Sequence, residues 1–142
     1  MGANDLESKV EEALASVVTA QALSGLNVHT GLDEDNLNVP YVICMCAGQG
    51  EEVLRDSGTF KLEAVVKVVS SADDETLAEH RSRLATVRDS IMDSGIAATL
   101  TAAVSEFHVY DVELAGLGAE FEDRKYSNSL ELNVTCCASD IG

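Results

Sequence analysis

Four cysteines and three histidines are the side chains of this chain that could support nucleophilic or metal chemistry. The thiols occur as Cys44-x-Cys46 and as the adjacent pair Cys136-Cys137, and neither spacing matches the C-x-x-C of a zinc or redox element. Both pairs lie in segments with strand composition, so Cys44 and Cys46 should share one face and Cys136 and Cys137 should point to opposite faces. We expect free thiols that pack as small hydrophobes, with a metal site shared by two paired strands as the alternative.

The three histidines, His29, His80 and His108, fall in separate predicted elements. A nucleophile, a base and an orienting acid can be named on paper, for example Cys44, His108 and Asp111, but no spacing supports them. His108 and Asp111 are expected on opposite faces of a strand. The sequence therefore predicts surface or packing roles for all three histidines, and no catalytic residue.

The glycine-rich and acidic segments also lack a recognisable binding pattern. Gly48-Gln49-Gly50 opens no predicted helix and is not followed by the Lys and Ser or Thr of a phosphate-binding loop. The acidic runs 33–35 and 73–75 could attract divalent cations but lack the spacing of a calcium loop. The second run is explained by a helix N-terminus, where acidic side chains complement the dipole. We expect no cofactor, no bound metal and no enzyme activity.

Charge is the strongest signal in the composition. The 142 residues include 25 acidic and 9 basic side chains, for a formal net charge of −16. Such a surface repels nucleic-acid backbones and anionic membranes. It serves either solubility or a high-salt habitat, or else a surface that must lie near DNA or like partners without adhering to them. No apolar run is long enough for a membrane span, and the N-terminus lacks a signal peptide, which indicates synthesis in a cytoplasm.

The length and the 46% hydrophobic content predict one domain over residues 1–142. Apolar residues at helical spacing predict a first helix over about 5–22, with Asn4 as N-cap. A second helix should run from a cap at Asp73 or Asp74 to about Asp93, and a shorter one over 96–103. The apolar stripe of the second helix should consist of Leu77, Leu84, Val87 and Ile91, with His80, Arg81, Arg83 and Arg88 on its flanks.

Two segments in the first half have strand composition. Residues 41–47 are apolar on both faces and 60–70 are rich in β-branched residues, so the two should pair as an antiparallel hairpin with a long tip at 48–58. Residues 27–38 are expected to be irregular. Because 41–47 is apolar on both faces in a chain with few helices, it should be covered on both sides, which favours assembly with other subunits.

Two more strands are predicted in the second half. Residues 107–114 and 129–136 alternate polar and apolar side chains, as half-exposed strands do, and 115–128 is expected to link them. The order helix, two strands, helix, two strands predicts an α/β fold of the α+β type. Its simplest form is a four-stranded, mainly antiparallel sheet with the two main helices packed on one face.

This order of elements resembles the small tail-terminator and tail-completion proteins of long-tailed bacteriophages, which join the tail tube to the head. The resemblance covers nearly the whole chain and lies in the pattern of elements, without a signature motif. It rests on the helix 6–22, the hairpin Tyr41-Val-Ile-Cys-Met with Leu62-Glu-Ala-Val-Val-Lys-Val, the helix that begins Glu75-Thr-Leu-Ala-Glu-His-Arg-Ser-Arg-Leu, and the strand Arg124-Lys-Tyr-Ser-Asn-Ser-Leu-Glu-Leu-Asn-Val.

The resemblance implies a virion structural protein made in the cytoplasm of a bacterial host. It implies a homo-oligomeric ring, usually of six subunits, that caps the tail tube and docks to neck or connector proteins. The genome passes through the bore without specific binding, which a negative lining would favour. The candidate contacts with other subunits or with the tail tube protein are Asp33, Glu34, Asp35, Glu51, Glu52, Arg55 and Asp56.

Two alternatives stay open. A head-side neck or stopper protein of the same kind of virion is the nearer one, because the cysteine content and the acidity of this chain depart from usual tail terminators. A type III secretion chaperone belongs to another class; such proteins are also small, acidic and cytoplasmic, and bind effector segments as dimers. Chaperones of this kind usually finish in a helix, whereas this chain is predicted to finish in the strand 130–137.

Overall fold

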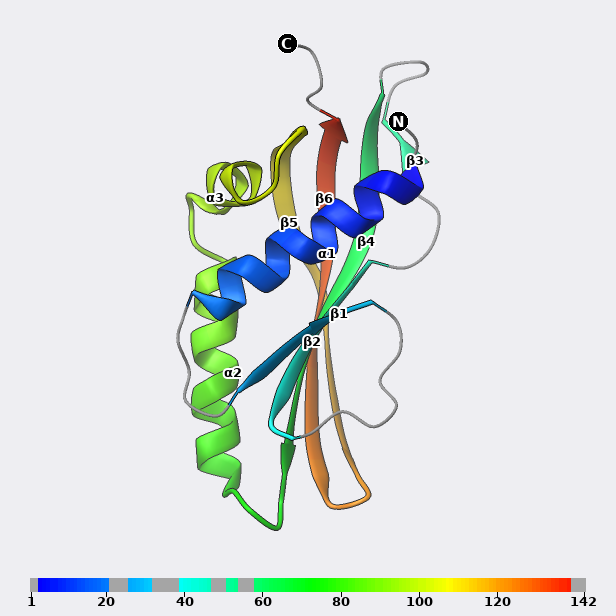
Figure 1. Ribbon diagram of the computed structural model, residues 1–142. Helices are drawn as coiled ribbons and strands as arrows, with labels where there is room; N and C mark the ends of the chain where they lie inside the picture. Colours follow the sequence, from blue (N-terminus) through cyan, green and yellow to red (C-terminus); the bar gives the residue numbers. More distant parts are fainter. Residues whose placement is uncertain (1–2, 21–25, 32–38, 47–50, 54–57, 139–142) are drawn as a thin grey trace.

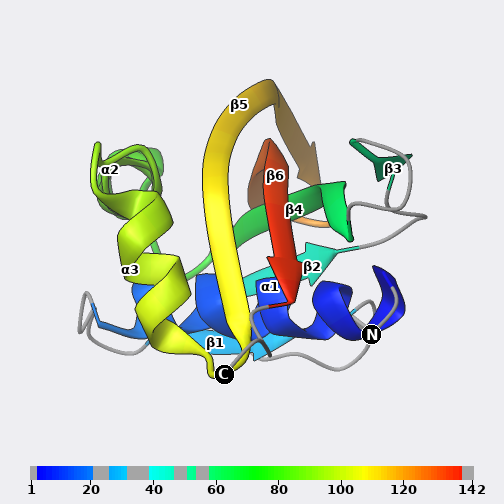
Figure 2. The same cartoon turned by 90° about the horizontal axis from the view of Figure 1, so that it is seen from above.

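Three helices and one mixed sheet make up the part of the chain that the computed structural model describes, namely residues 3–20, 26–31, 39–46, 51–53 and 58–138. The helices pack on one face of the sheet, with α1 crossing it obliquely (Figure 1) and α2 and α3 beside it (Figure 2). In chain order the elements are α1 (Ala3–Thr19), β1 (Asn27–Thr30), β2 (Tyr41–Cys46), β3 (Glu51–Glu52), β4 (Thr59–Ser71), α2 (Leu77–Ile91), α3 (Ile96–Ala103), β5 (Phe107–Glu122) and β6 (Lys125–Ala138).

The described strands lie in the order β1-β2-β4-β6-β5, and the two-residue β3 pairs with β4. The expected antiparallel pairing of β2 with β4 is confirmed, with Tyr41 opposite Val69. The α+β class is also confirmed, but the expectation of four strands was wrong in detail. Residues 27–30, expected to be irregular, form β1 parallel to β2, and β3 adds a further strand. Segments this short show no strand period in the sequence. They become strands through backbone pairing with a neighbouring strand.

The hairpin of β5 and β6 is the largest departure from the sequence prediction. Residues 115–128, expected to be a linker, form its distal half. Gly116 and Gly118 suggested a loop because glycine is depleted in strands. Here the side chains of Glu131 and Ser129 on β6 lie over these two glycines, so that a β-carbon at either position would meet them. The turn residues 123 and 124 both have positive φ, as tight hairpin turns require.

Two bulges in β5 decide which of its side chains face the helices. The register with β6 shifts between Val109 and Asp111 and again between Leu114 and Gly116. Each shift adds one residue and reverses the alternation of faces. The two reversals keep the apolar residues of β5 on one side, opposite the β6 residues that line the core. These helix-facing residues are Phe107, Val109, Val112, Leu114, Leu117, Ala119 and Phe121.

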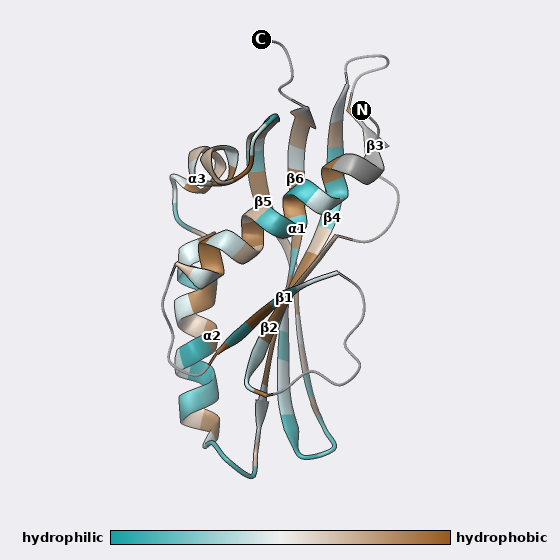
Figure 3. Ribbon diagram, in the orientation of Figure 1, coloured by the Kyte–Doolittle hydropathy of each residue, from teal (hydrophilic) through white to brown (hydrophobic). Residues whose placement is uncertain are grey.

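An aliphatic core fills the space between the helices and the sheet, consistent with the 4% aromatic content of the chain. Figure 3 shows the alternation of apolar and polar residues along α1 that places one of its faces in this core. A second, smaller cluster on the other face of the sheet contains Tyr41, Ile43 and Val69, which confirms that β2 is apolar on both sides. Of the described helices, none combines the length and apolar character needed to cross a bilayer.

Candidate assembly interface

The helix α2 is held at its start by a reciprocal cap. The N–H of Glu79 donates to Oγ1 of Thr76, and the N–H of Thr76 donates to Oε1 of Glu79, each at 3.2 Å. This capping box satisfies two backbone donors that a helix start otherwise leaves without partners. The prediction that Asp73 or Asp74 caps the helix was therefore wrong, because Thr76 has the matching Glu three residues later.

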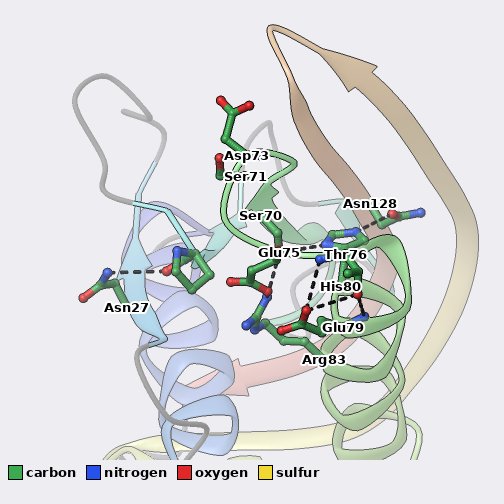
Figure 4. Close-up of polar contacts among 11 residues, drawn as sticks. Asn27, Ser70, Ser71, Asp73, Glu75, Thr76, Glu79, His80, Arg83 and Asn128 are labelled. Atoms are coloured by element: carbon green, nitrogen blue, oxygen red, sulfur yellow. Dashed lines mark hydrogen bonds and ion pairs between the residues drawn. The ribbon is translucent and has the colours of Figure 1, made fainter.

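A buried polar network fixes α2 against the sheet (Figure 4). The His80 ring places Nδ1 2.8 Å from Oγ of Ser70 on β4 and Nε2 2.7 Å from Oδ1 of Asn128 on β6. Nη1 of Arg83 donates to the same Ser70 oxygen at 2.7 Å. Since that oxygen accepts from Arg83, its own proton can go to Nδ1, and Nε2–H then donates to Asn128. One neutral tautomer of His80 thus satisfies every bond.

The network connects α2 to three strands. Asn128 passes the connection to β5, because its Nδ2 donates to the carbonyl of Gly118 at 3.4 Å. Nη1 of Arg83 also lies 2.7 Å from Oε2 of Glu75, which fixes the guanidinium. The sequence placed His80 on a flank of α2, which was wrong: its side chain is fully buried. A helix-period argument missed it because it counts His as polar, while the sheet supplies partners for both ring nitrogens.

The trio Ser70, His80 and Asn128 has the composition of a nucleophilic triad, but its geometry is structural. Ser70 and His80 both have 0% exposure, so no substrate carbonyl can approach the hydroxyl. The Ser70 oxygen is also occupied by the donor from Arg83. The network therefore positions α2 and the hairpin relative to each other.

Beyond this network, α2 and the distal part of the β5–β6 hairpin enclose an open groove of about 410 Å³, continuous with a hollow of about 260 Å³ that shares three of its lining residues. The α2 wall of this groove is formed by four residues on one face of the helix, which are spaced four, three and four positions apart. On the hairpin side the lining is mostly apolar. We call this the α2–β5 groove, defined by Leu77, Arg81, Leu84 and Arg88 of α2 and by Leu117, Ala119, Phe121 and Tyr126 of the hairpin.

Apolar side chains of β5 in this groove are exposed. Leu117 is 67% and Phe121 63% exposed, although Phe107 and Val109 on the same side of β5 are buried. The difference follows from the helix layer: α3 packs against the start of β5, and Oγ1 of Thr101 accepts the N–H of Val109 at 2.9 Å. Past this point, β6 is the only described strand that pairs with β5. A long edge with apolar side chains is a surface that natural proteins usually cover with a partner.

The edge region of the sheet opposite β5 presents different chemistry. There β3 pairs with β4, with Glu51 opposite Lys61 and Glu52 opposite Phe60, and the following residue, Val53, is 50% exposed. Two of the contact residues predicted from sequence, Glu51 and Glu52, thus lie on β3. The other five, namely Asp33, Glu34, Asp35, Arg55 and Asp56, lie outside the described residues.

The two predicted contact residues within the described ranges belong to β3, and neither is among the residues that line the α2–β5 groove. Sequence reasoning missed the groove because it treated 115–128 as a linker, where Leu117 and Phe121 have no face to share. The available signal was the alternation of Leu117, Ala119 and Phe121 with glycine and glutamate, which has a strand period.

The cysteines behave as the sequence predicted. All four are free, and Cys44, Cys46 and Cys136 are buried in the core between helices and sheet. Burial raises the pKa of each of these three thiols from 9.0 to about 12, and nearby carboxylates add to the effect for Cys44 and Cys46. Cys137 points to the other face, where its Sγ lies 3.4 Å from the Tyr110 hydroxyl. Within the described ranges, no three His, Cys, Asp or Glu residues are grouped so as to hold a metal ion.

The prediction that His108 and Asp111 point to opposite faces was wrong. They lie opposite Cys137 and Thr135 of β6, which are two residues apart and so share a face. Plain alternation would place residues three positions apart on opposite faces. The bulge inserts one extra residue between His108 and Asp111 and so returns them to the same face. Although His108 and Asp111 share a face, they do not form a catalytic set with Cys44, because Cys44 is buried on the other face of the sheet.

Comparison with known proteins yields a likeness of fold. No protein family model matches the chain, and no curated protein matches it in sequence. Among solved structures, a chain of "Virion of native gene transfer agent (GTA) particle" is similar, with a TM-score of 0.57 and 17% sequence identity. The similarity covers 91% of this chain and 98% of that chain. At this identity the likeness concerns the fold alone.

Proposed function

We propose that this chain is a structural subunit of a phage-like virion, and within it the tail terminator: a ring that caps the tail tube and joins it to the neck, with the genome passing through its bore. The observation that carries the proposal is the likeness of fold to a chain of a gene transfer agent virion, which extends over 91% of this chain and 98% of that one. The order of elements, similar to that of tail terminators, supports the finer assignment.

The chemical difference between the two edges of the sheet supports a ring. The β5 edge exposes the apolar side chains of Leu117 and Phe121, whereas β1, the edge strand on the other side, exposes the polar Asn27 and Thr30, so the two edges are chemically unlike. Unlike surfaces on opposite sides of one subunit favour head-to-tail contacts, and such contacts close into rings when the rotation between subunits allows it. Two like surfaces would instead favour a two-fold dimer.

The charge of the chain supports a bore through which DNA slides. On the sheet face that points away from the helices, the exposed carboxylates Glu63, Asp111, Glu113 and Glu131 outnumber the exposed lysines Lys61 and Lys125. A surface of this kind lining a bore repels phosphates and keeps the genome from binding to the wall. The subunit then acts by shape and charge, with no catalytic step.

The molar mass of the purified protein in solution tests this function, together with electron microscopy of the particles and of their mixture with tail tubes. We expect a six-subunit ring with a central hole that binds to the ends of the tubes. A ring that ignores tube ends but binds connector particles contradicts the terminator and favours the neck or stopper protein. A dimer at every salt concentration contradicts both and favours a chaperone.

A further inference from the structure

We infer that the subunits join by backbone pairing of their edge strands: β1 of one copy adds, antiparallel, to the distal half of β5 of the next copy. This inference rests on the proposed function, because it names the contact by which a head-to-tail ring is built. It assigns one occupant to the α2–β5 groove, namely a second copy of the chain, which covers the groove with β1 and with the helix that packs on β1.

The first argument is that both edges of the sheet are open. Within the described residues, β2 is the only strand that pairs with β1, and β6 is the only strand that pairs with β5. An open edge presents a row of backbone donors and acceptors that another strand can satisfy. Pairing of β1 with β5 of another copy satisfies both rows at once, and repetition of this unlike contact closes into a ring.

The strand directions fit such a contact. Strand β1 runs parallel to β2, and each later strand in the order β2-β4-β6-β5 is antiparallel to the one before it. Strands β1 and β5 of one subunit therefore run in opposite directions. Rotation about a ring axis that lies along the strands preserves strand direction and keeps the helices on the same side of the sheet. The neighbour's β1 then meets β5 as an antiparallel partner.

The helix-facing sides of the two strands also match. Val28 of β1 packs against the core between the helices and the sheet, whereas Leu117 and Phe121 of β5 are 67% and 63% exposed beside the groove. Since α3 packs only on the start of β5, the distal half has room for a neighbouring helix. The helix that arrives with β1 is α1, because the two elements are in contact and share one core. A partner of this kind buries Leu117 and Phe121.

The other face of β5 favours β1 over a second β5 as the partner. This face has four carboxylates, and β5 contains no Lys or Arg; the four are Asp111, Glu113, Glu120 and Glu122. A two-fold contact of β5 with itself would bring these carboxylates close to one another across the strands, which is destabilising. Strand β1 contains no charged residue at pH 7, and Asn27 and His29 alternate with the core-facing Val28.

The charge balance around the distal half of β5 allows identical subunits to approach there. The charged side chains that line the groove, its adjoining hollow and a hollow of about 140 Å³ on the other face of the sheet are four basic and three acidic. They are Arg81, Arg88, Lys67 and Lys125 against Glu120, Glu122 and Asp123. In a chain with a net charge of −16, this nearly neutral region is a place where a second copy meets little repulsion.

The neighbour's α1 suits the groove in charge. Among its described side chains, α1 carries three carboxylates, Glu7, Glu11 and Glu12, and one ammonium group, Lys9. The groove itself carries two guanidinium groups and the single carboxylate of Glu120. An acidic helix over a groove of positive balance gives complementary charges across the contact.

Cysteine pairs test the contact and its faces. In the full chain with Cys137→Ser, Thr30→Cys is combined with Leu117→Cys or with Ala119→Cys, which are helix-facing positions of β5. Mild oxidation of one of these two proteins should give a ladder of covalent oligomers that ends at the ring size. The matched control, Thr30→Cys with Glu120→Cys, places the thiols on opposite faces and should give no ladder.

The single variants exclude a two-fold contact. Neither Thr30→Cys nor Leu117→Cys alone should form covalent dimers, because a head-to-tail contact brings unlike positions together. Covalent dimers from Leu117→Cys alone would mean that β5 meets β5, and would overturn the inference.

A charge at Asn27 tests the other face of the contact. Asn27→Glu and Asn27→Lys both lose the bond from Nδ2 to the Pro40 carbonyl, so they are matched within the subunit. Against the carboxylates of β5, Glu should raise the dissociation constant of the ring and Lys should lower it, by up to about fivefold each per contact. Ser94→Glu and Ser94→Lys, at an exposed position off the sheet, measure the effect of net charge alone. Chemical unfolding verifies that all four variants fold.

The outcomes separate this inference from the function on which it rests. If the wild type forms rings that bind tube ends, but no Thr30→Cys pair gives a ladder, the inference is overturned and the proposed function stands. The same holds if the Asn27 variants differ no more than the Ser94 variants do. If the wild type forms no ring, the proposed function fails and the inference fails with it.

Discussion

Leu117 and Phe121 face the same side of β5 as the buried residues Phe107 and Val109, yet α3 covers only the start of the strand. Their exposure therefore reflects where the helix layer ends and not a change in the strand. Apolar side chains left exposed in a row lower the free energy of association when a partner buries them. This makes them the residues on which assembly should depend most.

The variant Leu117→Ser/Phe121→Ser should separate assembly from folding. Because both side chains are already exposed, we expect the free energy of unfolding of the single subunit to change by less than about 0.5 kcal/mol per site. The mass in solution should fall to that of the monomer. Tyr110→Ser, which removes a side chain that is 55% exposed on the other face, should leave the ring intact. Intact rings in the double variant would remove the groove from the interface.

The buried thiols predict a loss of stability at high pH. The pKa of Cys44 is raised from 9.0 to about 12 by burial, so the folded chain keeps this proton where the unfolded chain releases it. Stability is therefore full below about pH 9 and falls as the pH rises toward 12, by at most about 1.4 kcal/mol per pH unit for this thiol. The same sign applies to Cys46 and Cys136.

Urea unfolding at several pH values between these limits checks this prediction. The variant Cys44→Ala/Cys136→Ala should lose less stability per pH unit than the wild type, because two of the thiols no longer titrate. Val66→Ala, which shortens a buried side chain opposite Cys44 without removing an ionisable group, is the matched control and should keep nearly the wild-type slope. Equal slopes in all three proteins would contradict the assignment.

At the scale of elements, the position of α2 depends on polar bonds as much as on its apolar side chains. His80 joins the helix to Ser70 of β4 and Asn128 of β6, and Asn128 reaches Gly118 of β5. A buried network of this kind resists sliding of the helix along the sheet, because any shift leaves several donors and acceptors without partners. The width of the α2–β5 groove is set by the same bonds.

The variant His80→Ala should destabilise the subunit by roughly 2–4 kcal/mol, because it takes one hydrogen-bond partner from the buried Ser70 and one from the half-buried Asn128 and opens a small cavity. His108→Ala, which removes a partly exposed ring on β5, should cost much less. Chemical unfolding of both variants measures the difference. A cost for His80→Ala no larger than that for His108→Ala would contradict the role given to the network.

The β5–β6 hairpin shows why residues 115–128 were wrongly predicted to be a linker. Glycines at 116 and 118 and a charged turn gave 115–128 the local composition of a loop, but pairing with β6 along its full length outweighs that preference. The bulges in β5 depend on the register that β6 imposes. Neither the length of the hairpin nor the positions of the bulges can be predicted from alternation in β5 alone, because pairing with β6 decides where an extra residue is inserted.

At the scale of the whole molecule, the net charge of −16 opposes the approach of identical subunits. Salt should therefore promote the ring, since raising the ionic strength from 0.1 M to 1 M shortens the screening length from about 10 Å to about 3 Å. We expect the dissociation constant for assembly to fall over this range, even though screening also weakens individual ion pairs.

Sedimentation at increasing salt measures this effect. The control is the same series at pH 5, nearer the pI of 4.2, where the subunits carry less net charge and salt should matter less. Rings that dissociate as salt rises at neutral pH would show that attraction between charged groups outweighs the repulsion. That result would contradict the prediction for the whole subunit.

The sequence by itself determined that the helices exist, the pairing of β2 with β4, the burial of both faces of β2 and the packing of the thiols. These features depend on periods and compositions that each segment carries on its own, such as the apolar stripe of α1. The helix starts were wrong: the predicted cap Asn4 lies inside α1, which runs from Ala3 to Thr19, and α2 is capped by Thr76. The tertiary structure alone decided the full length of the hairpin, the faces of β5, the burial of His80 and the groove beside α2. These depend on contacts between segments distant in the chain, whose backbone pairing and side-chain partners outweigh local preference.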